Sequence, residues 1–223
     1  MNGMSIAPAR TDGLAAWIAP GRTALLMIDM QVDFAAPEGA IGQWGMDLST
    51  VPPALAAAER LAQGARAAGV PVIFVGLMTS PKTDSPAWTE RMRRQGHDPE
   101  GDSGLCRVNE PGADFYGPKP AQGETVVPKT RYSGFYDTPL DMILKRLNVD
   151  TIVTCGLTTE CCIDCTVRDA FHLDYHVFIP EDACAAYEPD LHTGALKSLE
   201  LNCAIIVKTD DVVSAWTESV SRG

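Results

Sequence analysis

No stretch of the 223-residue sequence approaches the ~18 uninterrupted apolar residues that suggest a membrane-spanning helix. Residues 1–22 contain no long apolar segment and carry charges at Arg10 and Asp12, so they do not resemble a signal peptide. Lys and Arg are also scarce: 18 of them stand against 29 Asp and Glu, which gives a formal net charge of −11. Nucleic acids and anionic membranes are bound by clustered basic residues, so we expect neither as a partner.

The sequence also lacks an internal repeat, a low-complexity tract and a glycine-rich phosphate loop. Asp29 and Asp33 do not have the Asp-x-Asp spacing of phosphoryl transfer on an aspartate, so that chemistry is disfavoured. Cysteine, in contrast, occurs seven times. Without a secretory signal, we expect these cysteines to be free thiols of a cytoplasmic protein rather than disulfides.

A series of short apolar runs rich in Val, Ile and Leu predicts six strands, at 24–29, 71–78, 125–129, 151–156, 175–180 and 204–209. The runs are nearly continuous rather than alternating, which is typical of parallel strands that are buried on both faces. Helical patterns separate them, at 53–69, 138–148, about 158–173, 189–201 and 211–220. This alternation predicts a single three-layer α/β/α, Rossmann-like domain over residues 1–223, with a mostly parallel sheet of about six strands.

One segment, 79–122, interrupts this alternation. It is rich in Gly, Pro and charged residues, and it contains a helical pattern near 86–95. Connections of this length inside a compact domain are usually lids or binding loops. We therefore expect 79–122 to cover or border a binding site.

Polar side chains follow three of the predicted strands. Asp29 ends the first strand, Lys129 ends the third, and the fourth runs into Cys155 and Gly156. Ligands bind at the carboxyl ends of strands in an open parallel sheet, so an acid, a base and a thiol are predicted to meet at one edge. Position alone leaves other interpretations open, because Asp29 could cap the turn after its strand and Lys129 could be a solvated lysine.

The segment 155–165, CGLTTECCIDC, holds four cysteines. Cys155 lies in a predicted strand and is expected to be a small buried core residue. Cys161, Cys162 and Cys165 fall in the first turns of the next helix, where the helix dipole and unpaired N–H groups lower the pKa of a thiol. The same N–H groups can bind the oxyanion that forms when a thiolate attacks a carbonyl. One of these sulfurs is therefore a candidate nucleophile.

A metal site is the main alternative for this cluster. A structural zinc site usually takes a second, separate pair of ligands, and the nearby His172 and His176 lie at the far end of the helix and on the next strand. A cysteine–histidine hydrolase is also poorly supported, because no histidine ends a strand at the active edge. Asp29 is then the carboxylate best placed to act as the base.

Three motifs together resemble the isochorismatase-like cysteine hydrolases, a family that includes nicotinamidases, N-carbamoylsarcosine amidases, ureidoacrylate hydrolases and biuret hydrolases. They are ALLMIDMQVDF with Asp29, VPKTRYSGF with Lys129, and GLTTECCIDCTVRDAFHLDY with the cysteines. The resemblance spans about residues 23–207. In the family pattern the nucleophile follows the strand-end glycine by six residues, which selects Cys162.

The resemblance implies a mechanism. Asp29 takes the thiol proton, Lys129 stabilises the developing charge, and Cys162 forms a thioester that water hydrolyses. The N–H groups of Thr158 and Cys162 would form an oxyanion hole, next to a non-proline cis peptide between Leu157 and Thr158. No metal and no cofactor is needed for any step.

Within the family, the chain from Gly156 onward looks most like the biuret and triuret hydrolases. The expected function is hydrolysis of a C–N amide bond in a small ureide: triuret to carboxybiuret or biuret plus ammonia, or biuret to allophanate plus ammonia. The alternative is an N-carbamoyl-amino-acid or ureidoacrylate amidohydrolase. Metal-binding nicotinamidases carry an Asp-x-His pattern after the second strand that is absent here, and isochorismatases proper lack the cysteine. A non-enzymatic thiol or metal-binding protein would leave Asp29 and Lys129 unexplained.

The same resemblance suggests a set of substrate contacts: Gln31, Phe34, Arg131, Tyr132, Leu157, Glu160 and Asn202. Phe34 could equally be a core residue. Asn202 stands where the biuret enzymes carry a longer glutamine, and a shorter amide favours triuret over biuret. Many relatives are oligomers, so a homotetramer is expected, and the 79–122 segment could borrow residues from a neighbouring chain.

Overall fold

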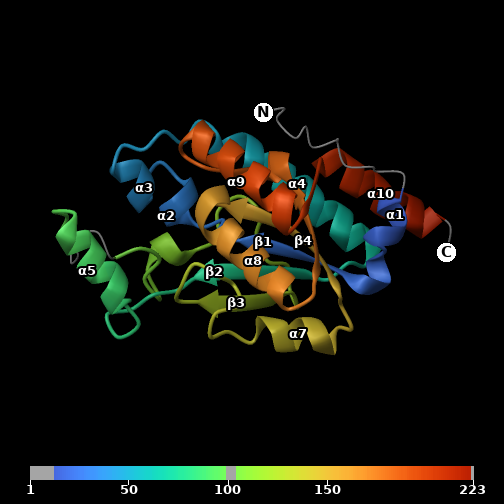
Figure 1. The fold of residues 1–223 in the computed structure, drawn as a ribbon, viewed down its shortest axis with the longest axis horizontal. Coiled ribbons are helices and arrows are strands. Elements are labelled where there is room, and N and C mark those ends of the chain that lie inside the picture. Colours follow the sequence, from blue (N-terminus) through green and yellow to red (C-terminus); the bar gives the residue numbers. More distant parts are fainter. Residues whose placement is uncertain (1–12, 99–103, 222–223) are drawn as a thin grey trace, which may run out of the picture.

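A computed structural model describes residues 13–98 and 104–221 of the chain. Its centre is a parallel sheet in the order β3-β2-β1-β4-β5-β7 (Figure 1). The strands are β1 (Thr23–Ile28), β2 (Val72–Leu77), β3 (Thr125–Lys129), β4 (Thr151–Leu157), β5 (His176–Pro180) and β7 (Ile205–Val207). A two-residue strand, β6 (Cys184–Ala185), pairs with β4. The predicted parallel sheet and its six strands are confirmed.

The central strands β1 and β4 are buried along their whole length. They pair in register, with Met27 opposite Cys155 and Ile28 opposite Gly156. Gly156 has a φ of 135°, and a Cβ atom there would lie 2.0 Å from the carbonyl oxygen of Ile28. Only glycine lets β4 approach β1 this closely before the chain turns into the cysteine segment.

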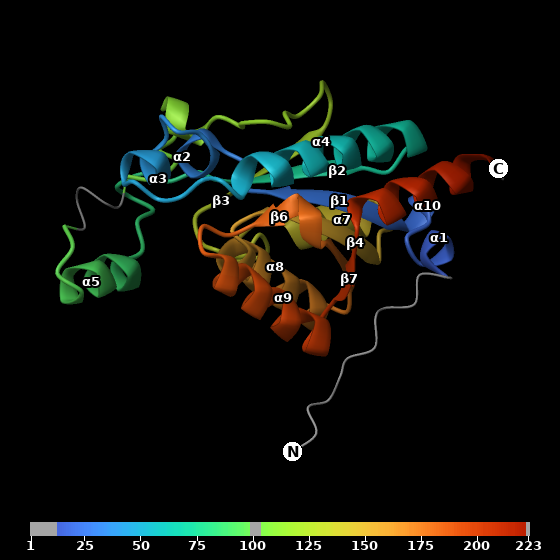
Figure 2. The same cartoon turned by 90° about the horizontal axis from the view of Figure 1, so that it is seen from above.

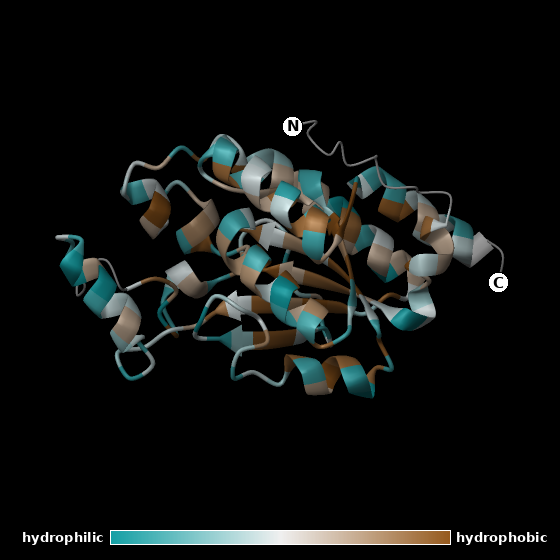
Figure 3. Ribbon diagram, viewed as in Figure 1, coloured by the Kyte–Doolittle hydropathy of each residue, from teal (hydrophilic) through white to brown (hydrophobic). Residues whose placement is uncertain are grey.

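Helices cover both faces of the sheet (Figure 2). On one face lie α4 (Val51–Ala68) and α10 (Thr209–Ser221), and on the other lie α8 (Asp164–His172) and α9 (Pro189–Asn202). A further helix, α7 (Leu140–Arg146), leads into β4. Apolar residues concentrate on the strands and on the inner sides of these helices (Figure 3). The three predicted layers are therefore present, and no helix among the described residues is long and apolar enough to cross a membrane.

Several short elements were not predicted. They are α1 (Leu14–Trp17), α2 (Val32–Ala35), α3 (Ala40–Gln43), β6, and 3-10 turns at Pro20–Arg22, Pro111–Ala113 and Glu181–Ala183. A single helical turn or a two-residue strand contains too few residues to show a hydrophobic period. The sequence therefore carries no signal for them.

The segment 79–122 contains the predicted helix, α5 (Pro86–Arg94), which stands away from the rest of the protein in Figures 1 and 2. None of its residues is buried. The Ser85 hydroxyl oxygen caps the helix by accepting a hydrogen bond from the Trp88 N–H at 3.3 Å. The polar α5 gains little from packing against its own chain.

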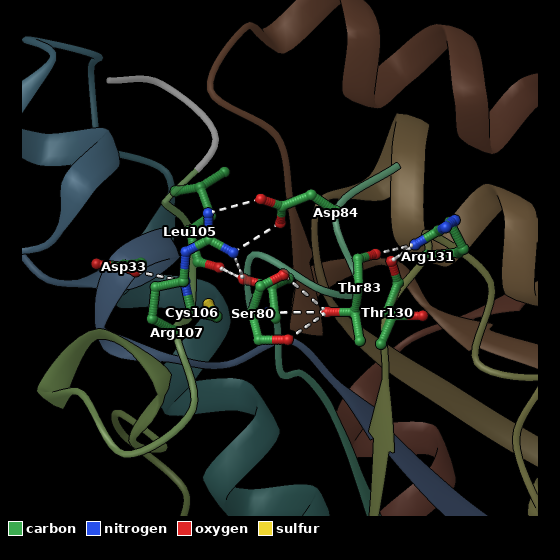
Figure 4. Close-up of polar contacts among 10 residues, drawn as sticks. Asp33, Ser80, Thr83, Asp84, Leu105, Cys106, Arg107, Thr130 and Arg131 are labelled. Atoms are coloured by element: carbon green, nitrogen blue, oxygen red, sulfur yellow. Dashed lines mark hydrogen bonds and ion pairs between the residues drawn. The ribbon is translucent and has the colours of Figure 1, made fainter. Parts of the chain in front are cut away.

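The chain leaves for α5 and returns from it through one polar junction, which we call the neck: Thr79, Asp84, Leu105 and Arg107. Asp84, Leu105 and Arg107 are labelled in Figure 4. The two Nη atoms of Arg107 lie 2.6 and 2.9 Å from the carboxylate oxygens of Asp84. The Thr79 hydroxyl donates to the Leu105 carbonyl at 2.6 Å and accepts from Arg107 at 3.2 Å. These contacts hold the base of the excursion in one position.

Candidate active site

The carboxylate of Asp29 and the ammonium of Lys129 meet at the carboxyl edge of the sheet, as predicted. Asp29 follows β1 with a φ of 49°, and Lys129 is the last residue of β3. Both side chains are fully buried, and Lys129 Nζ lies 2.7 Å from Asp29 Oδ2. The ammonium also donates to the carbonyl of Arg131 at 2.9 Å and to Cys162 Sγ at 3.4 Å. Its three protons therefore have three partners, and this satisfies a buried cation.

The two carboxylate oxygens of Asp29 have different surroundings. Oδ1 accepts a hydrogen bond from the N–H of Leu77 at 2.9 Å, which ties it to the end of β2. Oδ2 is buried and has the ion pair with Lys129 but no hydrogen bond of good geometry among the described residues. Oδ2 is thus the oxygen with a lone pair available for a proton.

Cys162 lies in a turn of π-helix, Thr159–Ile163, between β4 and α8. The peptide bond between Leu157 and Thr158 is cis, which confirms the expectation from the resemblance. The N–H groups on either side of Cys162, those of Cys161 and Ile163, both donate to the Thr158 carbonyl, at 3.2 and 3.1 Å. This tight turn presents the Cys162 sulfur to Lys129. π-Helical turns of this kind are frequent at functional sites.

The protonation of Cys162 differs from the sequence prediction. Contact with the Cys161 side chain, burial and the charge of Asp29 raise the pKa of Cys162 well above its usual value, while Lys129 opposes the change. The prediction of a lowered pKa considered the helix end alone and was wrong. Burial alone would lower the pKa of Lys129, but Asp29 and Cys162 raise it, so the lysine stays charged. Cys162 thus rests as a thiol beside a permanent cation.

A cavity of about 220 Å³ opens beside Cys162. Six of the predicted substrate contacts and oxyanion residues line it: Phe34, Arg131, Tyr132, Leu157, Thr158 and Cys162 itself. Phe34 is therefore a wall residue as well as a neighbour of the core. The cavity is also lined by residues that the sequence did not single out, among them Asp84, Trp88, Leu105 and Tyr187.

Three predicted substrate contacts do not line this cavity, and each makes hydrogen bonds elsewhere: Gln31, Glu160 and Asn202. Gln31 is fully buried, and its amide nitrogen donates to the carbonyls of Leu77 and Ala113, both at 2.8 Å. It joins β2 to the turn at 111–113. Glu160 does not line the cavity either, because its carboxylate accepts from the Thr158 hydroxyl at 2.9 Å.

Asn202 is the third correction. It ends α9 and donates from Nδ2 to the carbonyl of Ser198 at 2.7 Å. It borders a separate surface groove together with Arg22, which precedes β1, and His176, which begins β5. Asn202 therefore lies at the amino edge of the sheet, opposite Cys162, and it does not contact a substrate in the cavity of its own chain. The preference for triuret that depended on this side chain loses its basis.

The remaining cysteines of the segment separate as follows. Cys155 is fully buried in the core, as predicted, and Cys165 is half-buried in α8. Cys161, which the family pattern does not select as the nucleophile, lines the cavity next to Cys162. Among the described residues, no group of three or more His, Cys, Asp or Glu side chains could hold a metal ion.

Two cavity residues that were not predicted, Trp88 and Tyr187, stand in sequence patterns that only weakly indicate a binding site. Trp88 is an aromatic residue in a long polar segment, and such a residue is a candidate for a binding surface. Tyr187 follows the unpredicted strand β6, and its hydroxyl donates to the carbonyl of Phe34 at 2.9 Å. Nothing in the local pattern around Tyr187 distinguishes it from a core tyrosine.

Comparison with known proteins identifies similar chains. Residues 23–211 match the family model of the isochorismatase domain. The ureidoacrylate amidohydrolase RutB of Methylobacterium radiotolerans is 33% identical over 211 residues, which cover 89% of this chain and 80% of that protein. The RutB of Pseudomonas savastanoi pv. phaseolicola is 32% identical over 210 residues, which cover 89% of this chain and 85% of that protein.

Solved structures give the same result at the level of the fold. A cysteine hydrolase from Pseudomonas syringae pv. phaseolicola superimposes with a TM-score of 0.80 at 28% identity, over 97% of this chain and 100% of that one. The N-carbamoylsarcosine amidase from Thermoplasma acidophilum superimposes with a TM-score of 0.67 at 27% identity, over 85% of this chain and 97% of that one.

Proposed function

The chain belongs to the isochorismatase domain family as a cysteine hydrolase that acts on amide bonds, and on this premise we propose that its substrate is a ureido acid. A ureido acid carries a carbamoyl group on nitrogen and a carboxylate elsewhere in the molecule. The observation that carries the proposal is that Cys162 and the guanidinium-bearing Arg131 line the same cavity.

The first step is activation of the thiol. Cys162 rests protonated, so attack on the carbamoyl carbonyl requires a base at that moment. Asp29 accepts the proton on Oδ2, and Lys129, which contacts both groups, stabilises the thiolate as it forms. The N–H groups of Thr158 and Cys162 are the proposed donors to the oxyanion of the tetrahedral intermediate.

The second step breaks the C–N bond. The amine of the acid leaves with the proton that Asp29 took from the thiol, and the carbamoyl group stays on Cys162 as a thiocarbamate. Asp29 then takes a proton from water, the hydroxide attacks this carbonyl, and the thiol is regenerated as carbamate leaves. Asp29 is thus the group that accepts and returns the proton in both steps.

Arg131 supports recognition of a carboxylate. Its Nη1 donates to the carbonyls of Thr83 and Thr130, at 2.9 and 2.7 Å, which fixes the direction of the guanidinium (Figure 4). Among the described residues both hydrogen bonds of this guanidinium use Nη1, so the N–H groups on Nε and Nη2 are available. A planar guanidinium binds a carboxylate through two parallel hydrogen bonds.

The names of the similar proteins agree with this class. Ureidoacrylate and N-carbamoylsarcosine are both acids that carry a carbamoylated nitrogen, whereas biuret and triuret have no carboxylate. With Asn202 at the opposite edge of the sheet, the side chain that favoured a neutral urea oligomer no longer supports that choice.

The test is hydrolysis of ureidoacrylate, N-carbamoylsarcosine, biuret and triuret by the wild type and by Cys162→Ser and Arg131→Met. We expect the acids to be the better substrates and Cys162→Ser to be inactive. Arg131→Met should raise KM for the acids by about ten- to a hundredfold, since a charged hydrogen-bonded contact contributes about 1.5–3 kcal/mol. Arg146→Met, at an exposed position of α7, is the matched control and should behave as wild type.

Two results would contradict the proposal. Hydrolysis that survives Cys162→Ser would remove the nucleophile. Preferential turnover of biuret or triuret, with Arg131→Met neutral, would replace the acid by a neutral ureide.

A further inference from the structure

The turn that carries the cis peptide, residues 157–160, is held by two side chains that lie outside the cavity. Thr158 donates its hydroxyl to Glu160 Oε1 at 2.9 Å. The neighbouring Thr159 has its hydroxyl 2.8 Å from Nδ1 of His192, which comes from the first turn of α9. Two successive residues of the turn are thus each fixed by a separate partner.

The Glu160 carboxylate is partly buried beside the oxyanion turn. Its Oε2 is buried, and it has no hydrogen-bond partner among the described residues. A buried carboxylate oxygen without a partner costs free energy. Within residues 13–98 and 104–221, the Glu160 side chain accepts a hydrogen bond from Thr158, whose N–H is a proposed oxyanion donor. The free-energy cost of burying Glu160 Oε2 therefore accompanies the hydrogen bond that holds Thr158.

His192 joins the turn to a different helix. Thr159 is fully buried and His192 is half-buried, so the contact is shielded from solvent. Burial and the nearby Lys208 lower the pKa of His192, while Glu181 and Glu160 act in the opposite direction. At neutral pH the ring is uncharged, and Nδ1 can accept from the hydroxyl of Thr159. A charged ring could only donate, so the hydroxyl would have to reorient.

We propose that Glu160 and His192 are positioning residues that fix the oxyanion turn through Thr158 and Thr159. The inference rests on the proposed function, because it assumes that the Thr158 N–H binds the oxyanion. Neither residue lines the cavity beside Cys162. Each holds a threonine side chain, and the two contacts together orient the backbone on which the donor lies.

The expected effect follows from the geometry of such donors. An oxyanion donor acts on the charge that develops in the transition state, so an error in its direction lowers kcat rather than substrate affinity. Loss of a whole donor costs about 10²–10³ in kcat, and a misplaced donor costs less. Alanine at either position should therefore lower kcat about ten- to a hundredfold, with KM nearly unchanged.

The test compares replacements that remove each contact with replacements that keep it. Glu160→Ala and His192→Ala remove the contacts. Glu160→Gln keeps an acceptor for Thr158, and His192→Asn keeps an amide oxygen near the position of Nδ1, so both should recover most of kcat. Asp164→Ala and His172→Ala are matched controls. Asp164 pairs with Arg168 at the start of α8, and His172 is exposed at the end of the same helix.

The pH profile adds a readout that a merely structural role would not change. As the pH falls through the lowered pKa of His192, the wild-type ring gains a proton, and kcat should fall in part for this reason. His192→Asn cannot titrate, so its kcat should fall less on the acidic side. An equal fall in both would overturn the role of His192.

The inference is also overturned if both alanine variants keep kcat within twofold of wild type, if they raise KM alone, or if the controls lose as much. If an alanine variant does not fold, the inference is still tested by Glu160→Gln and His192→Asn, which keep the contacts. Their kcat values and pH profiles can be measured in its place. If Cys162→Ser is inactive while these variants are neutral, the proposed function stands and only this inference fails.

Discussion

The catalytic edge and the neck both hold charged side chains in ion pairs, but in different environments. At the catalytic edge, Asp29 and Lys129 are fully buried and each follows or ends a strand of the sheet. At the neck, the side chains of Asp84 and Arg107 keep about a fifth of their surface exposed, 23% and 22%. The first pair is fixed by the register of the sheet, whereas the second is fixed by its own hydrogen bonds. The reactive groups therefore depend on the pairing of the strands, and the approach to the cavity depends on a partly exposed ion pair.

The sharpest way to break this contrast is to remove one member of the buried pair. Lys129→Met leaves the Asp29 carboxylate buried and uncompensated, so we expect a stability loss of about 3–5 kcal/mol in denaturant unfolding. kcat should fall by about a hundredfold or more, because the thiolate loses its cation.

Lys145→Met is the control for this change. Lys145 makes an exposed i,i+4 pair with Asp141, and its removal should cost no more than about 0.5 kcal/mol. If the two variants unfold at the same denaturant concentration, the Asp29–Lys129 pair does not contribute to stability as its burial implies.

A substitution in the neck should have a smaller effect on catalysis than Lys129→Met. Arg107→Ala removes the bidentate pair with Asp84 and the bond to Thr79, so the base of the excursion should loosen. Asp84 and Trp88 line the cavity, and we expect KM to rise about tenfold, near the value of one charged hydrogen bond, with a smaller change in kcat.

Steady-state kinetics of Arg94→Ala is the comparison for Arg107→Ala. Arg94 pairs with Glu90 on the surface of α5, at 2.9 Å, and does not belong to the neck. A rise in KM of the same size in both variants would show that any loss of charge near α5 has this effect, and the neck would have no special role.

The smallest effect is expected at Cys161. Its thiol is the largest contribution to the raised pKa of Cys162, so Cys161→Ala should lower the pKa of Cys162. The thiolate then forms at lower pH, and half-maximal alkylation of Cys162 by iodoacetamide, followed by mass spectrometry, should shift downward. Cys165→Ala should leave the curve in place, and an upward shift for Cys161→Ala would contradict the assignment.

The same contrast explains which features could be predicted from the sequence. Asp29 and Lys129 were identified because each comes at the end of a continuous apolar run, and parallel strands bring such positions to one edge. The helix that starts after Thr158 was also visible, but its π-helical first turn and the contact with His192 depend on residues far apart in the chain. No periodicity encodes them.

Two errors have definite physical causes. Asn202 was assigned from resemblance along the sequence, and only the direction of α9 shows that its last residue lies at the opposite edge from Cys162. The pKa of Cys162 was predicted from the helix end alone, without burial, Cys161 or Asp29, which all act against the thiolate. Both depend on neighbours that a linear motif does not contain.

The closed neck has a consequence for how this enzyme can diversify. Because the chain leaves and re-enters through Asp84 and Arg107, the ends of the excursion stay at a fixed separation whatever lies between them. Lengthening a loop whose ends are held costs little, about 0.6 kcal/mol for each doubling. The α5 excursion is therefore a replaceable module: its length and composition can be exchanged, by evolution or by grafting, while the register of the sheet keeps the reactive sulfur and its two charged neighbours in place.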